Sequence, residues 1–463
     1  MIKNSQMNKY WIKNKYLNED RLDSYYYSQK FMSFEEKINK SALNKYKIVE
    51  MFKVLDGDHG TVENKIEGVP YLRAQNIKDG YIDYDNLVYI TTEQHSKSKR
   101  SMIYNQDILL SIMASTGMAA VFNEEVECNA NRAVGILRRK INSIDVYFLV
   151  ALINSKVGEV IFSRGIRGSI QKRLNLSDIG EIEVPIPSSE IQNYIGDKMR
   201  KAEELREKAK RWKKEADELF NKELDLDLNN SNFNSWYVGT KFLTENRLDQ
   251  SFYKPEYLRM YKKIEKYTGD KRKLSEFKVE FSTGAAVSSN DFINEGIPLI
   301  RIRDIGFNKL NFKTSNYVSN ETLNKFKKSK SQCEDIIIGM DGDDFRSNIF
   351  IEGNPTSLIN QRITIVKTND INPYYLYFYI NSYIGQKQLQ KYSVKTTVGH
   401  ISTENIKDLI VCIPEEKSYK EISMKIKKYL ENLYVSDDLI QEAKKDIEDL
   451  IEGNFDMSKL NQS

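Results

Sequence analysis

The chain has 463 residues, of which 40% are hydrophobic and 11% aromatic, enough for about three domains or two large ones with a connector. Seventy lysines and arginines oppose 66 acidic residues, and the net charge of +4 neither requires nor excludes nucleic acid as a partner. Three scattered cysteines predict no disulfide framework, and the polar start of the sequence shows no signal-peptide pattern. No run of 18 apolar residues occurs, so no spanning helix is expected. We therefore expect a soluble, cytoplasmic protein.

Two halves of the chain repeat each other at offsets of 226 to 230 residues. Residues 17–27 (LNEDRLDSYYY) agree with 243–253 (LTENRLDQSFY) at six of eleven positions, where chance gives about one. Further matches follow in the same order, and they pair 69–73 with 297–301, 107–110 with 335–338, 153–155 with 380–382, and 184–187 with 411–414. The repeat predicts two homologous halves of about 225 residues.

The first part of each half mixes short apolar runs with Gly, Asn and Asp turns, which is typical of short strands in an α+β domain. The runs lie at 108–113, 133–137, 336–338 and 363–366. An amphipathic helix is expected before the proline-bearing end of each half, at 146–162 and 374–389.

Long segments rich in Lys and Glu follow these prolines. In the second segment, apolar residues from Ile422 to Leu450 recur at alternating spacings of three and four, and only Ser436 breaks the seam. This heptad pattern is compatible with helices that pack on their own domains, but two helices of equal length favour a mutual antiparallel coiled coil. Each would span roughly 45 to 50 Å at about 1.5 Å per residue, as a spacer does.

The predicted fold class is α+β, with two repeated globular domains joined by two long helices that form an antiparallel coiled coil with internal pseudo-two-fold symmetry. The expected division is a first domain at 1–188, a first long helix at 189–221, a linker at 222–235, a second domain at 236–415, a second long helix at 416–453 and a tail at 454–463.

This arrangement resembles the specificity (S) subunit of type I restriction-modification systems, in which two target-recognition domains are separated by long helices. Arg21-Leu22-Asp23 and Arg247-Leu248-Asp249 precede the two domains, and Asn360-Gln361-Arg362 is similar to a frequent strand motif of the family. Residues 168–175 (GSIQKRLN) are close to the pattern that closes these domains, whereas the second half departs from it at 396–402 (TTVGHIS). The matches extend over nearly the whole chain.

The resemblance implies a non-catalytic DNA-binding subunit of a phage-defence system that reads a bipartite sequence in double-stranded DNA. Its partners would be two methyltransferase (M) subunits and restriction (R) subunits, and S-adenosylmethionine, ATP and magnesium would belong to those partners. The alternatives are a coiled-coil adaptor without DNA contact and a specificity subunit of another DNA-methylation defence system without nuclease.

Candidate catalytic motifs are weak. Asn372-Pro373-Tyr374-Tyr375 lacks the second proline of an amino-methyltransferase motif and is better interpreted as a helix start. Glu415-Glu416-Lys417 echoes a nuclease site but lies at the start of a predicted helix. Residues 341–344 (DGDD) fit no EF-hand spacing, and the three histidines are far apart, so neither a metal site nor a triad is predicted.

Basic, polar loops occur at matching places in both halves and favour DNA binding over the adaptor. Lysine and arginine bind phosphates, while Arg, Asn and Asp side chains read base edges. The predicted DNA-binding residues are Arg73, Lys99, Arg100, Ser115, Thr116, Arg167, Lys172, Arg173, Arg301, Arg303, Asp341, Lys395 and His400.

Overall fold

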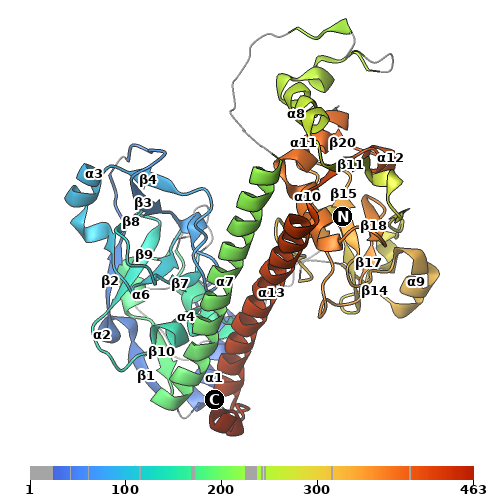
Figure 1. The fold of residues 1–463 in the computed structure, drawn as a ribbon. Helices are drawn as coiled ribbons and strands as arrows, with labels where there is room; N and C mark the ends of the chain where they lie inside the picture. The colour runs from blue at the N-terminus through green and yellow to red at the C-terminus, as the bar shows by residue number, and fades with distance from the viewer. Residues whose placement is uncertain are drawn as a thin grey trace, which may run out of the picture. The chain divides into compact units, whose positions relative to one another are not determined.

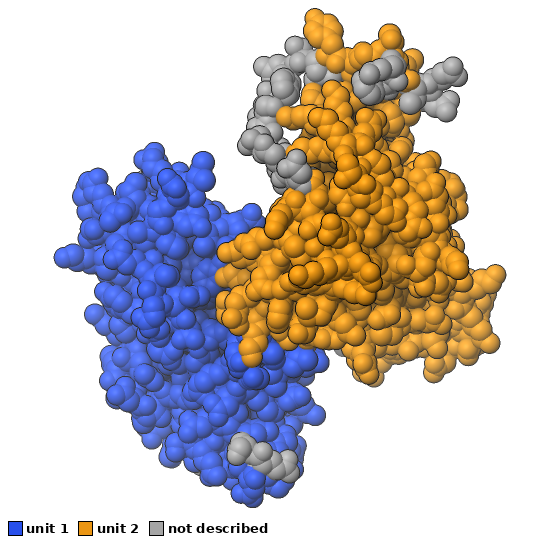
Figure 2. Space-filling model, in the orientation of Figure 1, with its two compact units in different colours: residues 1–205, 435–463 blue, residues 206–434 orange. Residues whose placement is uncertain are grey.

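The computed structural model describes residues 24–462 except 42, 61, 114–115, 168–172, 225–236, 241–242, 244–246, 314–315 and 396–397. The chain divides into two compact units, coloured separately in Figure 2. Unit 1 comprises residues 1–205 and 435–463, and unit 2 comprises residues 206–434. The Arg-Leu-Asp motif of the second half is described at 247–249, whereas Arg21, Leu22 and Asp23 lie outside the described residues.

Unit 1 contains two four-stranded sheets with strand orders β2-β9-β6-β7 and β4-β3-β8-β5, and a two-stranded antiparallel sheet of β1 and β10. All neighbouring strands of the larger sheets are antiparallel except β3 and β8, which run parallel. Its elements, apart from the long helices, are α1 Gln29–Lys40, β1 Asn44–Lys47, α2 Ile48–Met51, β2 Phe52–Asp56, β3 Val69–Leu72, η2 Ala74–Asn76, β4 Val88–Ile90, α3 Thr92–Lys97, η3 Lys99–Ser101, β5 Met102–Ile103, β6 Ile108–Ser111, β7 Ala119–Val121, β8 Cys128–Ala130, β9 Val134–Arg139, α4 Val146–Asn154, α5 Lys156–Arg164, α6 Leu176–Gly180, β10 Glu183–Ile186 and η10 Met457–Gln462.

Unit 2 repeats this order with sheets β12-β18-β15-β16 and β14-β13-β17, and β13 and β17 again run parallel. Its main elements are η5 Gln250–Tyr253, α8 Pro255–Lys266, β11 Asp270–Lys273, β12 Val279–Thr283, β13 Ile297–Ile300, η8 Ile302–Asp304, β14 Asn316–Val318, α9 Asn320–Lys325, η9 Lys327–Ser329, β15 Ile336–Gly339, β16 Ser347–Ile349, β17 Leu358–Ile359, β18 Ile363–Thr368, α10 Pro373–Asn381, α11 Tyr383–Tyr392, β19 Val394–Lys395, β20 Gly399–His400, α12 Thr403–Lys407 and β21 Ile410–Ile413.

The two predicted amphipathic helices are each broken into two, which corrects the sequence-based expectation. Ser155 separates α4 from α5, which bend by 78°, and Ser382 separates α10 from α11. Each serine caps the second helix, because its Oγ accepts a hydrogen bond from Gly158 N or Gly385 N at 3.3 Å. Residues 146–153 of α4 are all buried, so this helix forms the core of unit 1 and has no amphipathic face.

The long helices α7 (Ser189–Glu223) and α13 (Glu416–Glu452) pair antiparallel, as predicted. Figure 1 draws α7 in green beside α13 in red. In unit 1, Lys198 Nζ of α7 lies 2.7 Å from Asp446 of α13. In unit 2, Glu223 at the end of α7 accepts a hydrogen bond at 2.9 Å from Ser418 at the start of α13. Late residues of one helix thus face early residues of the other.

The helix seam follows the heptad spacing. Ala202, Ala209 and Ala216, seven residues apart, are buried, and so are Ile422 and Ile440 on α13. The sequence predicts a break at Ser436. Its side chain is nevertheless fully buried, because the hydroxyl donates a hydrogen bond to the carbonyl of Ala202 at 2.8 Å. A polar residue is therefore accommodated within the seam.

No single helix among the described residues has the length and hydropathy of a membrane span. The bent pair of α4 and α5 passes such a test only as two helices taken together, and α4 is a core helix.

Candidate nucleic-acid interface

In both units, two backbone segments come into close contact at a parallel bridge next to the candidate site, and we call this contact the backbone crossing. Asp58 forms a parallel bridge with Asn131 in unit 1, and Ala285 forms the same bridge with Asn360 in unit 2. The preceding residue is glycine in both units, Gly57 and Gly284. A Cβ at either position would lie 2.2 Å from the carbonyl oxygen of the facing asparagine. This backbone approach excludes every side chain and fixes the loops on either side of it.

Charged residues gather beside this crossing in unit 1. Asp56, at the end of β2, has a buried carboxylate with Arg100 Nη2 at 2.8 Å and His59 Nε2 at 2.6 Å. Asp58 accepts a hydrogen bond from Ser98 Oγ at 2.8 Å. We call these five residues, Asp56, Asp58, His59, Ser98 and Arg100, the first polar cluster. Arg100 was predicted from the sequence, and the structure gives it a carboxylate partner.

Unit 2 carries a second polar cluster of Asp341, Arg362 and His400. His400 Nδ1 lies 2.6 Å from Asp341 Oδ1, and Arg362 Nε lies 3.8 Å from Asp341 Oδ2. The backbone places them together, because Asp341 and His400 form an antiparallel bridge and Met340 N donates to Arg362 O at 3.0 Å. The structure thus brings together two predicted residues that are 59 positions apart.

Arg73 and Arg301 occupy the same place in the two units, at the first residue after β3 and β13. Each backbone N–H donates at 3.0 Å to a side-chain oxygen three residues later, from Asn76 or Asp304. The Nε of each arginine is buried, and no hydrogen-bond partner for it is found within the described part of the chain. Arg301 also lies over the ring of Phe292, 4.7 Å from its centroid. Buried donors are usually satisfied, so the two unpaired Nε–H groups are an uncommon feature that both units share.

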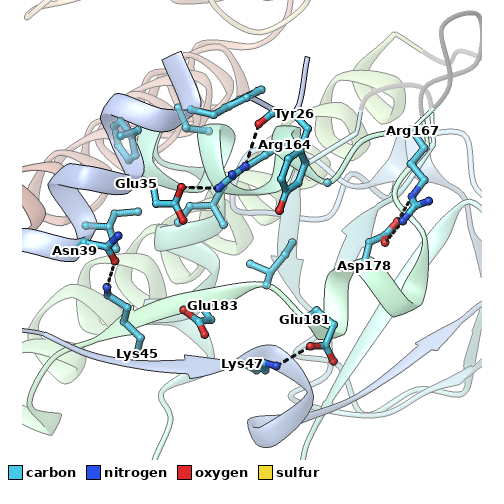
Figure 3. A pocket seen from close by; sticks show the side chains of 17 residues that line it. Tyr26, Glu35, Asn39, Lys45, Lys47, Arg164, Arg167, Asp178, Glu181 and Glu183 are labelled. Carbon is cyan, nitrogen blue, oxygen red and sulfur yellow. Dashed lines mark hydrogen bonds and ion pairs between the residues drawn. The ribbon is translucent and has the colours of Figure 1, made fainter. Parts of the chain in front are cut away.

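Arg167 and Arg173 are held together by two backbone hydrogen bonds of 2.9 and 3.0 Å. The Arg167 guanidinium pairs with Asp178 at 2.8 Å and forms part of the wall of a cavity of about 550 Å³ in unit 1. Figure 3 shows two other charged pairs in this cavity, Arg164 with Glu35 at 3.0 Å and Lys47 with Glu181 at 2.7 Å. The charges of the cavity therefore partly neutralise one another, which makes Arg167 a weaker candidate than Arg173.

The other predicted residues are placed as follows. Lys99 is exposed in η3 next to Arg100, and Thr116 lies half-buried in a turn. Arg303 Nη2 donates to Asn316 Oδ1 at 2.8 Å. Ser115 and Lys172 lie outside the described residues, and for Lys395 only the backbone, in β19, is described.

Sequence reasoning missed Asp56, Asp58, His59 and Arg362 as site residues. A signal for the first three exists in residues 56–60 (DGDHG), where charged residues and glycines follow an apolar strand. Arg362 ends the Asn-Gln-Arg motif that carries the family resemblance. The predicted helix start at Asn372 is confirmed, since its Oδ1 accepts a hydrogen bond from Tyr374 N at 2.9 Å.

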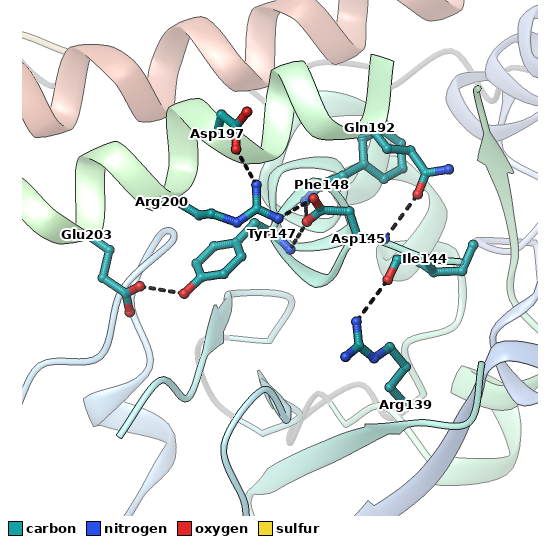
Figure 4. Close-up of polar contacts among 9 residues, drawn as sticks. All are labelled: Arg139, Ile144, Asp145, Tyr147, Phe148, Gln192, Asp197, Arg200 and Glu203. Carbon is teal, nitrogen blue, oxygen red and sulfur yellow. Dashed lines mark hydrogen bonds and ion pairs between the residues drawn. The ribbon is translucent and has the colours of Figure 1, made fainter. Parts of the chain in front are cut away.

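A network at the start of α4 fixes the unit 1 domain on α7 (Figure 4). The buried carboxylate of Asp145 caps α4 through Tyr147 N at 2.8 Å and forms an ion pair with Arg200 of α7. Gln192 Oε1 accepts from Asp145 N at 3.1 Å, and the Tyr147 hydroxyl donates to Glu203 at 2.5 Å. Burial, together with the Glu203 carboxylate, raises the pKa of the Tyr147 hydroxyl well above its usual value.

Among the described residues, no group of three His, Cys, Asp or Glu side chains has the geometry of a metal site. Both clusters described above combine carboxylates with arginine or histidine, a composition that can donate and accept hydrogen bonds at base edges.

Part of the chain matches a family of known proteins. Residues 44–215 match the family described as type I restriction modification DNA specificity domain. The chain is 30% identical over 139 residues to the type I restriction enzyme EcoBI specificity subunit of Escherichia coli, covering 30% of this chain and 29% of that protein. It is 24% identical over 193 residues to the MjaVIII specificity subunit of Methanocaldococcus jannaschii, covering 40% and 45%, respectively. The chain thus matches less than half the length of these curated relatives.

A solved structure also aligns with the chain. The type-I restriction-modification system S subunit from M. genitalium aligns over 90% of this chain and 97% of its own, with 13% sequence identity and a TM-score of 0.47. The predicted resemblance to type I specificity subunits is confirmed by the family match and the curated relatives.

Proposed function

We propose that this chain, whose residues 44–215 belong to the type I restriction modification DNA specificity domain family, reads a bipartite sequence in double-stranded DNA. Each repeated domain recognises one half of that target, and the paired helices hold the two domains. The observation that carries this proposal is the repeat of one framework with different polar side chains. Arg73 and Arg301, with unsatisfied Nε atoms, recur at the same place, whereas the two clusters differ.

The proposal assigns no catalytic step to this chain. It directs methyltransferase (M) subunits, and restriction (R) subunits where the system has them, to the target in the cytoplasm. S-adenosylmethionine, ATP and magnesium then bind to those partners. In support of this assignment, the candidate catalytic residues Asn372 and Glu416 are parts of helix starts.

We also propose that the functional division follows the domains expected from the sequence, with recognition domains at 1–188 and 236–415 and spacers at 189–221 and 416–453. The division of the chain into two compact units, each containing part of both long helices, supports this assignment.

The test is DNA binding by the full chain assembled with its M subunits. Arg73→Ala and Arg301→Ala should each weaken binding, and each should lower the slope of log K against log salt by about one if the residue contacts a phosphate. Lys30→Ala is the matched control, because Lys30 is exposed on α1 and pairs with Glu159. An assembled complex that binds all DNA sequences equally would refute the proposed function.

A further inference from the structure

Arg100 is held in an unusual way for an exposed arginine. Its side chain is 68% exposed in η3, yet its Nη2 lies 2.8 Å from Asp56, whose side chain is only 6% exposed. Asp56 is the last residue of β2, an edge strand of its sheet, and its other oxygen contacts His59. A strand residue fixed within a sheet thus orients a side chain that projects to solvent.

This geometry is suited to contact with a base edge. Within the described residues Asp56 is the one hydrogen-bond partner of the Arg100 side chain, so the guanidinium keeps N–H groups for a ligand. Guanine presents two acceptors, N7 and O6, in the major groove, and arginine meets both at once. Bidentate contact with guanine requires the planar fork of an arginine, whereas a phosphate can also be bound by the point charge of a lysine.

The fold itself does not require this pair, as the second unit demonstrates. At the same two positions unit 2 has Thr283 at the end of β12 and Lys328 in η9. There the contact is a hydrogen bond from Ser329 Oγ to the Thr283 carbonyl at 3.4 Å. Among the described residues no carboxylate lies within ion-pair distance of Lys328, whose ammonium group is a point charge suited to phosphate. A buried carboxylate costs free energy unless it is paired. Because the fold does not require a carboxylate at this position, we infer that Asp56 serves the function of the domain.

We propose that Arg100 is the residue by which the first domain selects a guanine, and that Asp56 is a positioning residue that orients it. This inference rests on the proposed function and deepens it, because it names the base and the side chains responsible. Lys328, at the same place in the second domain, selects no base.

The experiment is sequencing of methylated sites in cells that express the full chain with its M subunits. The wild type should require a G·C pair at one position of one half-target. Arg100→Lys keeps the positive charge, so it should relax that one position by about tenfold or more in discrimination and leave the remaining bases unchanged. Asp56→Asn should relax the same position. Lys328→Ala is the matched control and should change no base in either half.

Each other outcome is decisive. If Arg100→Lys and Arg100→Ala methylate the same sequences as the wild type, the assignment is wrong. If Arg100→Ala lowers binding equally for all sequences, Arg100 is a phosphate contact and the assignment is also wrong. If the wild-type complex shows no sequence-selective methylation, the proposed function fails first, so the two failures are distinguishable. Hydrogen exchange of β2 and η3 in each variant separates local unfolding from a change in reading.

Discussion

The two units attach their core helix to the long helices with different chemistry. In unit 1 the start of α4 is anchored by charge, through the Asp145–Arg200 ion pair and the Tyr147–Glu203 hydrogen bond. In unit 2 the N-cap of α10 is the neutral Asn372, whose backbone N–H donates at 2.6 Å to the Tyr419 hydroxyl of α13. One backbone framework therefore accepts either an ionic or a neutral junction.

The same contrast extends along the two core helices. Residues 146–153 of α4 include one tyrosine, whereas α10 has four, and two of their hydroxyls bond carbonyls of β21. Tyr375 donates to Cys412 O at 2.5 Å and Tyr379 to Ile410 O at 2.9 Å. Burial raises the pKa of both hydroxyls well above the usual value, so they stay protonated and remain donors. The lesson is that corresponding core helices occupy the same place in the fold although different side-chain contacts hold them there.

The largest expected effect is that of Asp145→Ala. It removes the charged cap of α4, worth about 2 kcal/mol, and the ion pair with the partly exposed Arg200, worth about 1 kcal/mol, so we expect local destabilisation of about 3 kcal/mol. Hydrogen exchange of the amides of α4 measures it. Asn372→Ala, the matched change in unit 2, should cost only about 1 kcal/mol because only a cap is lost. Equal losses in the two units would show that the charge of Asp145 contributes nothing.

Tyr375→Phe should have the next largest effect. Phenylalanine stands at the matching position of unit 1, Phe148, so the ring itself fits this fold. In unit 2, however, the change leaves the buried Cys412 carbonyl without this donor, and we expect a loss of about 2 kcal/mol in the exchange protection of α10. Tyr383→Phe, outside the buried core of α10, is the control. Unchanged protection of α10 would mean that the hydroxyl bond is not stabilising.

A smaller effect is expected from converting the first junction into the second. Asp145→Asn alone should destabilise α4, and the double variant with Arg200→Lys should recover part of that loss, because Asn372 and Lys427 hold these positions in unit 2. Since Arg200 is 42% exposed, the coupling should be about 1 kcal/mol. A double-mutant cycle measured on α4 amides gives this number. Strict additivity would rule out a direct interaction.

The smallest expected effect is that of salt. Raising the salt concentration from about 0.1 M to about 1 M screens exposed charges, so protection of α4 should fall by a few tenths of a kcal/mol. Protection of α10, whose junction is neutral, should stay constant. Comparing the two helices in one sample provides an internal control. If salt lowers the exchange protection of α10 more than that of α4, the assignment of an ionic junction to unit 1 and a neutral junction to unit 2 is wrong.

The sequence predicted the repeat, the α+β class and the antiparallel helix pair, because these features depend on periodic patterns that can be recognised in a single sequence. The residues at 202, 209 and 216 carry such a pattern in full. The segment predicted as the first long helix contains a glycine, Gly196, which is unfavourable within a helix and which the sequence alone does not explain. The structure accounts for it, since a Cβ there would lie 2.7 Å from a carboxylate oxygen of Asp145.

The helix breaks and the site contacts were beyond prediction for physical reasons. Ser155 and Ser382 interrupt strongly apolar segments. A serine in such a segment caps a new helix only if its hydroxyl can accept a hydrogen bond from a backbone N–H without a helical partner, and the sequence does not show whether it can. Asp56 and Arg100 are 44 residues apart, and their contact depends on how several loops close. Arg73 and Arg301 could be predicted as a pair because the repeat places them at matching positions, and their role in binding DNA stays a prediction.

The glycine crossings at 57 and 284 have a consequence for protein engineering. Because no side chain fits there, the backbone on either side is held in one geometry whichever loops it carries. The segments that begin at these glycines and end at Asn131 or Asn360 therefore have matched ends. A transplant of residues 57–131 into the place of 284–360 keeps both splice points on the same backbone bridge. Because this segment carries the buried strands β6 and β7, recombination at these points would exchange part of the core together with the loops.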